Sequence, residues 1–186
     1  MRYRAAPALF ACVLASFGVG CRSKPEHIVQ VPTTQLAGRP SFAALWEAYP
    51  RGTPGDVVGM IGGKVAYNYD TDPLYRNTCA IRISRALNYG SAPIQRGVAG
   101  ALSNSGSDKR WYIFRMAELG NYLTARYGAP AELPTDASAK SLAHRHGIVS
   151  FGKLHIDLWN GDTCGTANYF GSDKFTGPIL FWEMAE

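Results

Sequence analysis

Helix-like and strand-like patterns are segregated along this chain, with the helices first and the strands last. Between Ser41 and Gly128 the apolar residues recur mainly at helical spacing. Beyond Gly147 four short segments are typical of strands, at residues 148–151, 154–159, 167–170 and 179–182. Strands that follow one another without helices between them favour antiparallel pairing. The order therefore predicts an α+β fold in which N-terminal helices pack on a C-terminal antiparallel sheet.

The first 20 residues have the composition of a secretory signal peptide. Arg2 and Arg4 precede an apolar run that ends in small residues directly before Cys21. No later segment reaches the roughly 18 consecutive apolar residues that a transmembrane helix needs. Gly20-Cys21 is similar to the end of a bacterial lipobox, so Cys21 is a candidate lipidation site and membrane tether. Simple signal cleavage and an uncleaved anchor remain alternatives.

Residues 21–40 are polar, contain prolines and lack apolar periodicity, which predicts a flexible linker. The remaining residues, 41–186, have the size of one domain with a single core. Loss of Arg2 and Arg4 with a signal peptide would lower the formal net charge from +5 to +3. So small a surplus does not indicate nucleic acid as a partner, although it is compatible with an anionic polymer such as a cell wall.

The cysteine count narrows the candidates for chemistry. Cys12 lies in the signal segment and Cys21 at its boundary, which leaves Cys79 and Cys164 in the predicted domain. Two cysteines do not form a disulfide scaffold. In an exported protein, a single bridge between Cys79 and Cys164 remains an alternative to a free thiol.

Cys79 stands at the start of a predicted helix. Ala80, Ile83 and Leu87 recur at helical spacing, and Asn88-Tyr89-Gly90 is typical of a helix C-terminus. The free N–H groups and the positive dipole at a helix N-terminus favour an anion, and so a reactive thiolate. The same N–H groups can stabilise an oxyanion. Cys79 is therefore a candidate nucleophile, and a buried cysteine that packs as a small hydrophobe is the alternative.

His155 begins a strand pattern that is followed by a turn signal. Asn160-Gly161 predicts a two-residue type I′ hairpin turn, which would place His155 opposite Thr166. Alternation puts His155 and Asp157 on one face, with Thr166 and Asn168 on the corresponding face of the next strand. A histidine among groups that can orient it is suited to act as a base. A histidine without a catalytic role is the alternative.

Both neighbourhoods belong to a larger pattern that resembles one family. The pattern comprises Asn77–Asn88, Trp-Tyr-Ile-Phe-Arg-Met from Trp111, Gly-Ile-Val from Gly147, and His-Ile-Asp-Leu-Trp-Asn-Gly from His155. These segments are similar to the fourth family of type VI secretion amidase effectors, which are papain-like peptidoglycan amidases of the NlpC type. The similarity extends roughly from Pro40 to the C-terminus. It implies a papain-like NlpC-type fold, with Cys79 as nucleophile, His155 as base, and no metal or organic cofactor.

The resemblance also implies a substrate and a partner. Family members hydrolyse the amide between γ-D-glutamate and meso-diaminopimelate in peptidoglycan stem peptides, and they bind a cognate immunity protein that plugs the cleft. The crosslink between diaminopimelate and D-alanine is an alternative scissile bond. Injected effectors ordinarily lack a signal peptide, so action in the periplasm of the producing cell stands beside delivery to a target cell's periplasm. A non-catalytic exported lipoprotein on the same fold, binding the wall or an immunity protein, is the alternative function.

The chain departs from the family pattern near the third catalytic position. The aspartate found there in other members aligns with Thr166, whose hydroxyl cannot stabilise an imidazolium as a carboxylate does. Thr166, Asp157 and Asn168 are therefore the three candidates for orienting His155. Cys164 matches one half of a local disulfide of some members, and Asn168 occupies the other half. The resemblance thus implies that Cys164 is unpaired.

Overall fold

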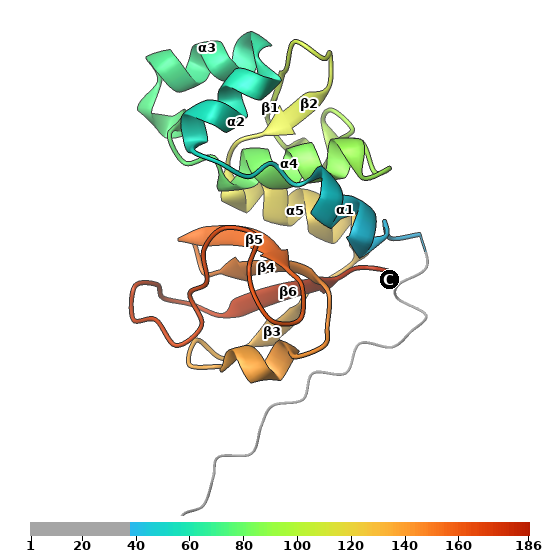
Figure 1. The fold of residues 1–186 in the computed structure, drawn as a ribbon, viewed down its shortest axis with the longest axis vertical. Coiled ribbons are helices and arrows are strands. Elements are labelled where there is room, and N and C mark those ends of the chain that lie inside the picture. Colours follow the sequence, from blue (N-terminus) through green and yellow to red (C-terminus); the bar gives the residue numbers. More distant parts are fainter. Residues whose placement is uncertain (1–37) are drawn as a thin grey trace, which may run out of the picture.

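The structure, a computed structural model, describes residues 38–186 and consists of a helical layer and a sheet layer (Figure 1). The predicted signal peptide, Cys21 and nearly all of the predicted linker lie outside the described residues. Within residues 38–186, no helix has both the length and the apolar character needed to cross a membrane.

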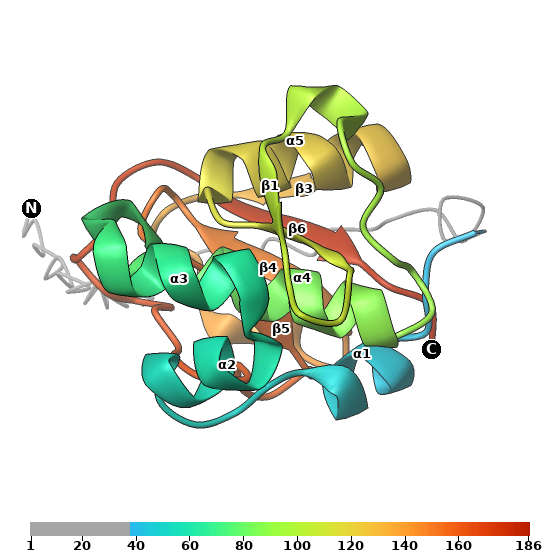
Figure 2. The same ribbon diagram turned by 90° about the horizontal axis from the view of Figure 1, so that it is seen from above.

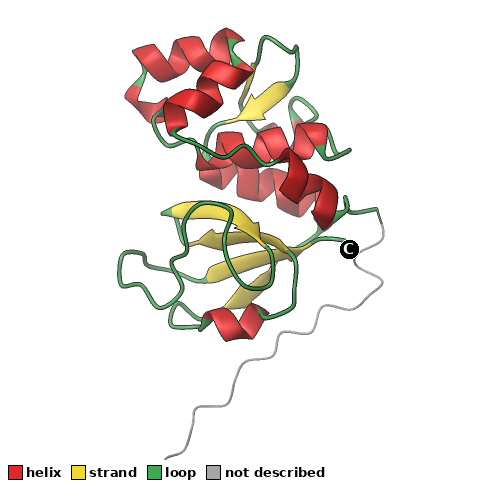
Figure 3. Cartoon of the chain, in the orientation of Figure 1, coloured by secondary structure: helices red, strands yellow, loops and turns green. Residues whose placement is uncertain are grey.

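Within residues 38–186, five α-helices precede the four-stranded sheet, and Figure 3 shows them grouped on one side of that sheet. The helices are α1 (Phe42–Ala48), α2 (Pro54–Ile61), α3 (Gly63–Thr71), α4 (Cys79–Tyr89) and α5 (Met116–Tyr127). The strands are β1 (Ser103–Ser105), β2 (Trp111–Ile113), β3 (Ala131–Leu133), β4 (Gly147–Phe151), β5 (His155–Trp159) and β6 (Ile179–Glu183). β1 and β2 form a small antiparallel pair, and the other four form an antiparallel sheet in the order β3-β6-β4-β5. The predicted α+β order is confirmed.

α4 is the central helix of the molecule. It contacts α1, β2 and β5, and it overlies the sheet in the view from above (Figure 2). Nearly every residue of α4 is buried, including the polar residues Ser84 and Asn88. Ser84 Oγ accepts the N–H of Ile113 at 3.0 Å, and Asn88 Nδ2 donates to the Trp111 carbonyl at 2.8 Å. Because these buried polar groups are paired, α4 can be enclosed without a large desolvation cost.

Both faces of the sheet are covered, which fixes the register of β5. Ile156 and Leu158 belong to the core beneath α4 and α5, whereas Trp159 belongs to a second core on the opposite face. A slip of one residue would exchange the two faces and expose these side chains. Full burial of each large apolar side chain contributes about 1.5–3 kcal/mol. The position of His155 at the start of β5 is therefore set by the packing of its neighbours.

A three-residue turn leads from β4 into β5. Phe151 pairs with His155, so residues 152–154 form the connection. Gly152 has φ +53°, and a Cβ there would lie 2.2 Å from the Thr176 carbonyl oxygen. Only glycine fits this position, since it lacks the Cβ and tolerates a positive φ.

The sequence-based prediction of a strand at residues 167–170 is wrong. Asn168 Oδ1 accepts the N–H of Phe170 at 2.9 Å, which turns the chain away from extended pairing. The rings of Tyr169 and Phe170 pack against Phe151. The apolar character of this segment thus comes from loop packing on the second core rather than from a strand.

The predicted linker ends earlier than expected. Arg39 is buried, and its guanidinium donates to the carbonyl groups of Tyr127 and Glu183. The Pro40 carbonyl accepts the N–H of Ala185, and Phe42 N–H donates to the Ala185 carbonyl. Residues 39 and 40 therefore belong to the folded domain, and their hydrogen bonds connect them to residues 183 and 185.

Candidate active site

Cys79 is the first residue of α4 and is 4% exposed. Asn77 Oδ1 accepts the N–H of Cys79 at 3.2 Å, which forms an Asx turn just before the helix. The N-cap residue, Thr78, makes no side-chain capping bond, so the Asn77 side chain satisfies one of the unpaired N–H groups at the start of the helix. The predicted position of Cys79 at the start of a helix is confirmed.

Cys79 and Cys164 are both free thiols and both buried. The alternative of a Cys79–Cys164 bridge is therefore wrong. Burial raises the pKa of Cys164, and the nearby Asp157 carboxylate raises that pKa further. Cys164 is thus a neutral thiol at physiological pH, whereas a nucleophilic cysteine reacts as the thiolate.

The structure brings His155 into contact with both Cys79 and Asp157. His155 Nε2 lies 3.1 Å from Asp157 Oδ2, and the imidazole also interacts with the Cys79 side chain. Burial alone would lower the pKa of His155, but the hydrogen bonds to Asp157 and Cys79 outweigh burial and raise that pKa to about 9. His155 therefore carries a proton at neutral pH, placed between a carboxylate and a thiol.

Asp157 is fully buried and strongly hydrogen-bonded. Its Oδ2 accepts the Thr166 N–H at 2.8 Å, the Thr166 hydroxyl at 2.7 Å and the Ala167 N–H at 3.1 Å, while Oδ1 accepts the Leu158 N–H at 2.8 Å. Burial would raise the pKa of Asp157, but hydrogen bonds, that from His155 foremost, hold it below its ordinary value. Asp157 is thus a buried, ionised carboxylate.

The three candidates for orienting His155 have different positions. Asp157 contacts the imidazole directly. The Thr166 hydroxyl lies 3.5 Å from His155 Nε2 and donates its shorter bond to Asp157. Asn168 is exposed, and its side-chain oxygen is engaged by the Phe170 N–H. The geometry therefore favours Asp157, supported by Thr166, over Asn168.

The predicted two-residue turn at Asn160-Gly161 is wrong in length. Trp159 pairs with Cys164 across a four-residue connection, and Asn160 Oδ1 accepts the N–H groups of Asp162 and Thr163. An Asx side chain of this kind stabilises the longer turn. The pairing shifts by two residues, so Thr166 lies beside Asp157 instead of opposite His155.

Tyr49 is a further residue at this site, and the sequence alone does not identify it. The side chain is 2% exposed, and the residue follows the C-terminus of α1. Its hydroxyl faces Asp157 without a hydrogen bond of ordinary geometry to any described group. Burial, and then the Asp157 carboxylate, raise the pKa of Tyr49. No local sequence signal distinguishes this tyrosine from a core residue.

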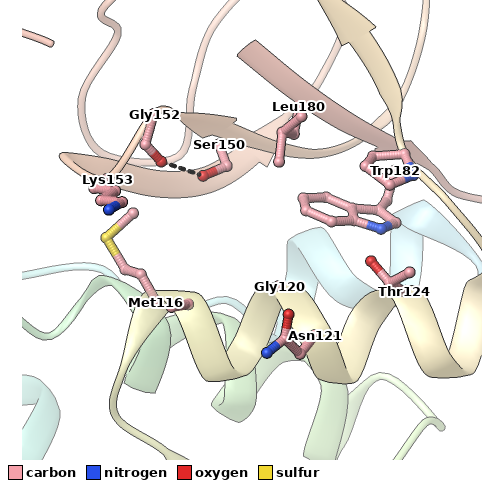
Figure 4. A pocket seen from close by; sticks show the side chains of 11 residues that line it. Met116, Gly120, Asn121, Thr124, Ser150, Gly152, Lys153, Leu180 and Trp182 are labelled. Carbon is pink, nitrogen blue, oxygen red and sulfur yellow. Dashed lines mark hydrogen bonds between the residues drawn. The ribbon is translucent and has the colours of Figure 1, made fainter. Parts of the chain in front are cut away.

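Other features of residues 38–186 do not enlarge this site. No three His, Cys, Asp or Glu side chains in this range are grouped as a metal site would require. A cavity of about 470 Å³ lies between α5 and the sheet, and Trp182, Met116 and Gly120 are among the residues that line it (Figure 4). Lys153, in the turn before His155, stands at this cavity, whereas neither Cys79 nor His155 lines it.

Comparison with known proteins gives a consistent result. Residues 75–182 match the family model described as type VI secretion system amidase effector protein 4, or Tae4. That segment includes Cys79, His155, Asp157 and Thr166. None of the curated proteins matches the chain.

Several solved structures are similar in both sequence and fold. The type VI effector Tae4 from Enterobacter cloacae is 29% identical, with a TM-score of 0.69, and the match covers 78% of this chain and 97% of that chain. Tae4 in the effector–immunity complex Tae4–Tai4 from the same organism has the same identity and TM-score, and 99% of that chain is covered. Tae4 from Salmonella Typhimurium, also in complex with Tai4, is 28% identical over 78% of this chain and 99% of that one, with a TM-score of 0.68.

Proposed function

The chain belongs to the type VI secretion system amidase effector protein 4 family, and on that basis we propose that Cys79, His155 and Asp157 carry out its reaction. The protein is an amidase that acts on peptidoglycan. The observation that carries the residue assignment is the grouping of the Cys79 thiol, the His155 imidazole and the buried Asp157 carboxylate, in which His155 Nε2 lies 3.1 Å from Asp157 Oδ2. This is the arrangement of a cysteine hydrolase, in which a base activates the thiol and a third group orients the base.

The raised pKa of His155 keeps the imidazole protonated at neutral pH, and in this proposal the imidazolium stabilises the thiolate form of the nucleophile. The thiolate of Cys79 attacks the amide carbonyl carbon, and the carbonyl oxygen becomes an oxyanion. N–H groups at the start of α4 stabilise the oxyanion. In the structure the Cys79 N–H donates to Asn77 Oδ1 at 3.2 Å, which is long for a hydrogen bond. The oxyanion is a stronger acceptor and can replace Asn77 Oδ1 as the partner of this N–H.

His155 then acts as the general acid. It donates its proton to the leaving amine as the C–N bond breaks, which leaves an acyl thioester on Cys79. Water enters, His155 accepts a proton from it, and hydroxide attack on the thioester releases the acid product. Asp157 stays ionised throughout and stabilises the imidazolium.

The departure at Thr166 is compensated within β5 in this proposal. Asp157 supplies the carboxylate, while Thr166 and the N–H of Ala167 hold that carboxylate toward His155. Thr166 is then a positioning residue rather than the third catalytic group. The alternative of a non-catalytic wall-binding or immunity-binding protein is not favoured. Although position 166 is a threonine, Asp157 supplies a carboxylate that contacts His155.

We propose that the scissile bond is the amide between γ-D-glutamate and meso-diaminopimelate, and that a cognate immunity protein occludes Cys79. The support for the partner is the Tae4–Tai4 complexes from Enterobacter cloacae and Salmonella Typhimurium. The site of action that fits an effector of this family is the periplasm of a target cell. The signal peptide at residues 1–20 and lipidation of Cys21 remain predictions from the sequence.

Digestion of purified sacculi tests the function. Wild-type protein is expected to release stem-peptide fragments whose masses identify the cleaved bond, whereas Cys79→Ala is expected to release none. Asn168→Ala is the matched control within the same loop and is expected to retain activity, since Asn168 does not contact His155. Turnover by Cys79→Ala at the wild-type rate would refute the nucleophile assignment.

A further inference from the structure

Among residues 38–186, Tyr49 has a buried hydroxyl that faces the Asp157 carboxylate, and the mechanism above gives that hydroxyl no role. Its side chain is 2% exposed, and the hydroxyl oxygen is shielded from solvent without a regular hydrogen-bond partner among the described residues. An unpaired buried hydroxyl destabilises the folded state. A phenylalanine would avoid that destabilisation, so the presence of the hydroxyl beside a catalytic carboxylate calls for an explanation.

The backbone around Tyr49 is held to the nucleophile helix. Arg82, one turn after Cys79 in α4, is buried and donates to the Pro50 carbonyl at 2.7 Å and to the Gly52 carbonyl at 2.8 Å. These two bonds fix the segment that directly follows Tyr49. Movement of the tyrosine relative to α4 is thereby restricted.

The ring of Tyr49 is also held from the side of Asp157. A Cβ added at Gly165 would lie 2.8 Å from Tyr49 Cε1 and 2.9 Å from Asp157 Oδ1. Only a residue without a side chain leaves room for both the tyrosine ring and the carboxylate beside this loop. Tyr49 and Asp157 therefore pack against the same glycine.

We propose that Tyr49 is a positioning residue, whose hydroxyl is directed at Asp157 and holds the carboxylate in the orientation that pairs with His155. The inference rests on the proposed function of Asp157. With this contact, Tyr49 connects two parts of α4. Arg82 of α4 holds the backbone of residues 50–52, which follows Tyr49 directly. On the other side, Asp157 contacts His155, which interacts with Cys79 at the start of α4.

The hydroxyl keeps its proton at this position, so it can donate to the carboxylate. Burial and the Asp157 carboxylate raise the pKa of Tyr49, and the Thr166 hydroxyl and the Arg82 charge only partly oppose them. The other ionisable groups that face Asp157 are His155 and the neutral thiol of Cys164, and the group that faces His155 from α4 is Cys79. A donor on the carboxylate shares its negative charge with His155. Loss of that donor leaves more of the charge to the imidazolium and strengthens its hold on the proton.

The test compares Tyr49→Phe with Tyr127→Phe. Tyr127 in α5 also has a buried hydroxyl without a regular partner, but it lies away from Asp157, so it matches the loss of an oxygen without the proposed role. Two readouts are measured against pH: the rate of Cys79 alkylation by iodoacetamide, followed by mass spectrometry of the Cys79 peptide, and kcat and KM on sacculi.

Tyr49→Phe is expected to move the alkaline limb of both profiles upward by about half a unit to one unit, since part of the effect of one hydrogen bond to Asp157 is passed on to His155. We also expect kcat to fall by roughly threefold to tenfold with KM unchanged, since a more tightly held proton is transferred less readily to the leaving amine. Tyr127→Phe should superimpose on the wild type. Profiles of Tyr49→Phe that coincide with those of the wild type would overturn the inference.

A second variant keeps the test independent of the folding of Tyr49→Phe. Gly165→Ala places a methyl group between the Tyr49 ring and Asp157, and it is expected to change the alkaline limb without changing KM. An unchanged limb in that variant would also overturn the inference. Cys79→Ala distinguishes failure of the proposed function from failure of this inference. If Cys79→Ala remains active, the nucleophile assignment is wrong. If Cys79→Ala is inactive but the pH profiles of Tyr49→Phe do not shift, only the role of Tyr49 is wrong.

Discussion

At the scale of single residues, the site depends on one buried carboxylate that keeps its charge. Asp157 accepts hydrogen bonds from the backbone N–H groups of Leu158, Thr166 and Ala167, besides those from side chains. Backbone donors do not titrate, so the carboxylate remains ionised even though it is excluded from water. The imidazolium of His155 is therefore opposed by a permanent negative charge.

Replacement of Asp157 by asparagine should disable the enzyme. The amide keeps the shape of the side chain but removes the charge that raises the pKa of His155. We expect kcat on sacculi to fall by on the order of 10²–10⁴, as for loss of the orienting carboxylate in other triads. The alkaline limb of Cys79 alkylation should also move down in pH. Wild-type turnover by this variant would exclude Asp157 as the orienting group.

The raised pKa of His155 predicts how both activity and stability depend on pH. Its pKa is about 9 in the folded protein against the ordinary value of 6.5. The stabilisation from the protonated imidazole is therefore complete below pH 6.5 and is lost as the pH rises through about 9. Activity should fall over the same upper range, because the general acid loses its proton.

Urea unfolding at a series of pH values checks the stability part of this prediction. The wild type should lose stability between pH 6.5 and about 9, and His155→Gln should lose less over that interval. Equal losses in the two proteins would show that another group titrates there.

The sequence predicted Cys79 and His155 but left their third partner open among three residues. The reason is physical: a pairing count across a turn depends on the turn length, and the Asn160 side chain stabilises a connection two residues longer than the Asn-Gly pattern indicates. Tyr49 could not be found at all, because a tyrosine on an apolar helix face gives the same pattern whether or not its hydroxyl meets a charge.

At the scale of secondary-structure elements, the turn between β4 and β5 determines where His155 begins its strand. Gly152 has a positive φ and approaches the Thr176 carbonyl, so it determines the geometry of this turn. Elements supported by clear apolar patterns, namely α4, β4, β5 and β6, were predicted from the sequence. The short strands β1, β2 and β3 were not predicted, because three residues carry too little periodicity to be recognised.

Gly152→Ala should reduce both stability and activity. The added Cβ would lie 2.2 Å from the Thr176 oxygen, so the turn must shift, and His155 with it. We expect a loss of about 1–3 kcal/mol or more in the free energy of unfolding, measured in urea. Gly171→Ala is the matched control, since Gly171 also has a positive φ but meets nothing within 4 Å. Equal losses in the two variants would show that backbone strain alone is responsible.

At the scale of the whole molecule, the helical layer and the sheet are joined at the two ends of the described chain. Ser41 and Ala185 form an isolated parallel bridge, and the guanidinium of Arg39 spans the carbonyl groups of Tyr127 and Glu183. The position of the C-terminus beside α1 is visible in Figure 1. The sequence did not predict this closure, because the contacts join residues that are 88 and 144 positions apart.

Arg39→Ala should therefore destabilise the domain while leaving its chemistry intact. The variant loses two charged hydrogen bonds and leaves two carbonyl groups without their donor, and each such bond contributes about 1.5–3 kcal/mol. Arg51→Ala is the control, because Arg51 is exposed and its bonds to the carbonyl groups of Trp46 and Tyr49 are long, at 3.4 and 3.5 Å. Chemical denaturation should show a clear loss for Arg39→Ala and almost none for Arg51→Ala. The hydrogen bonds of Arg39 are made to Tyr127 and Glu183 rather than to the catalytic residues, so kcat of the folded Arg39→Ala protein should match that of the wild type. A lower kcat would mean that the Arg39 contacts influence the geometry of the active site.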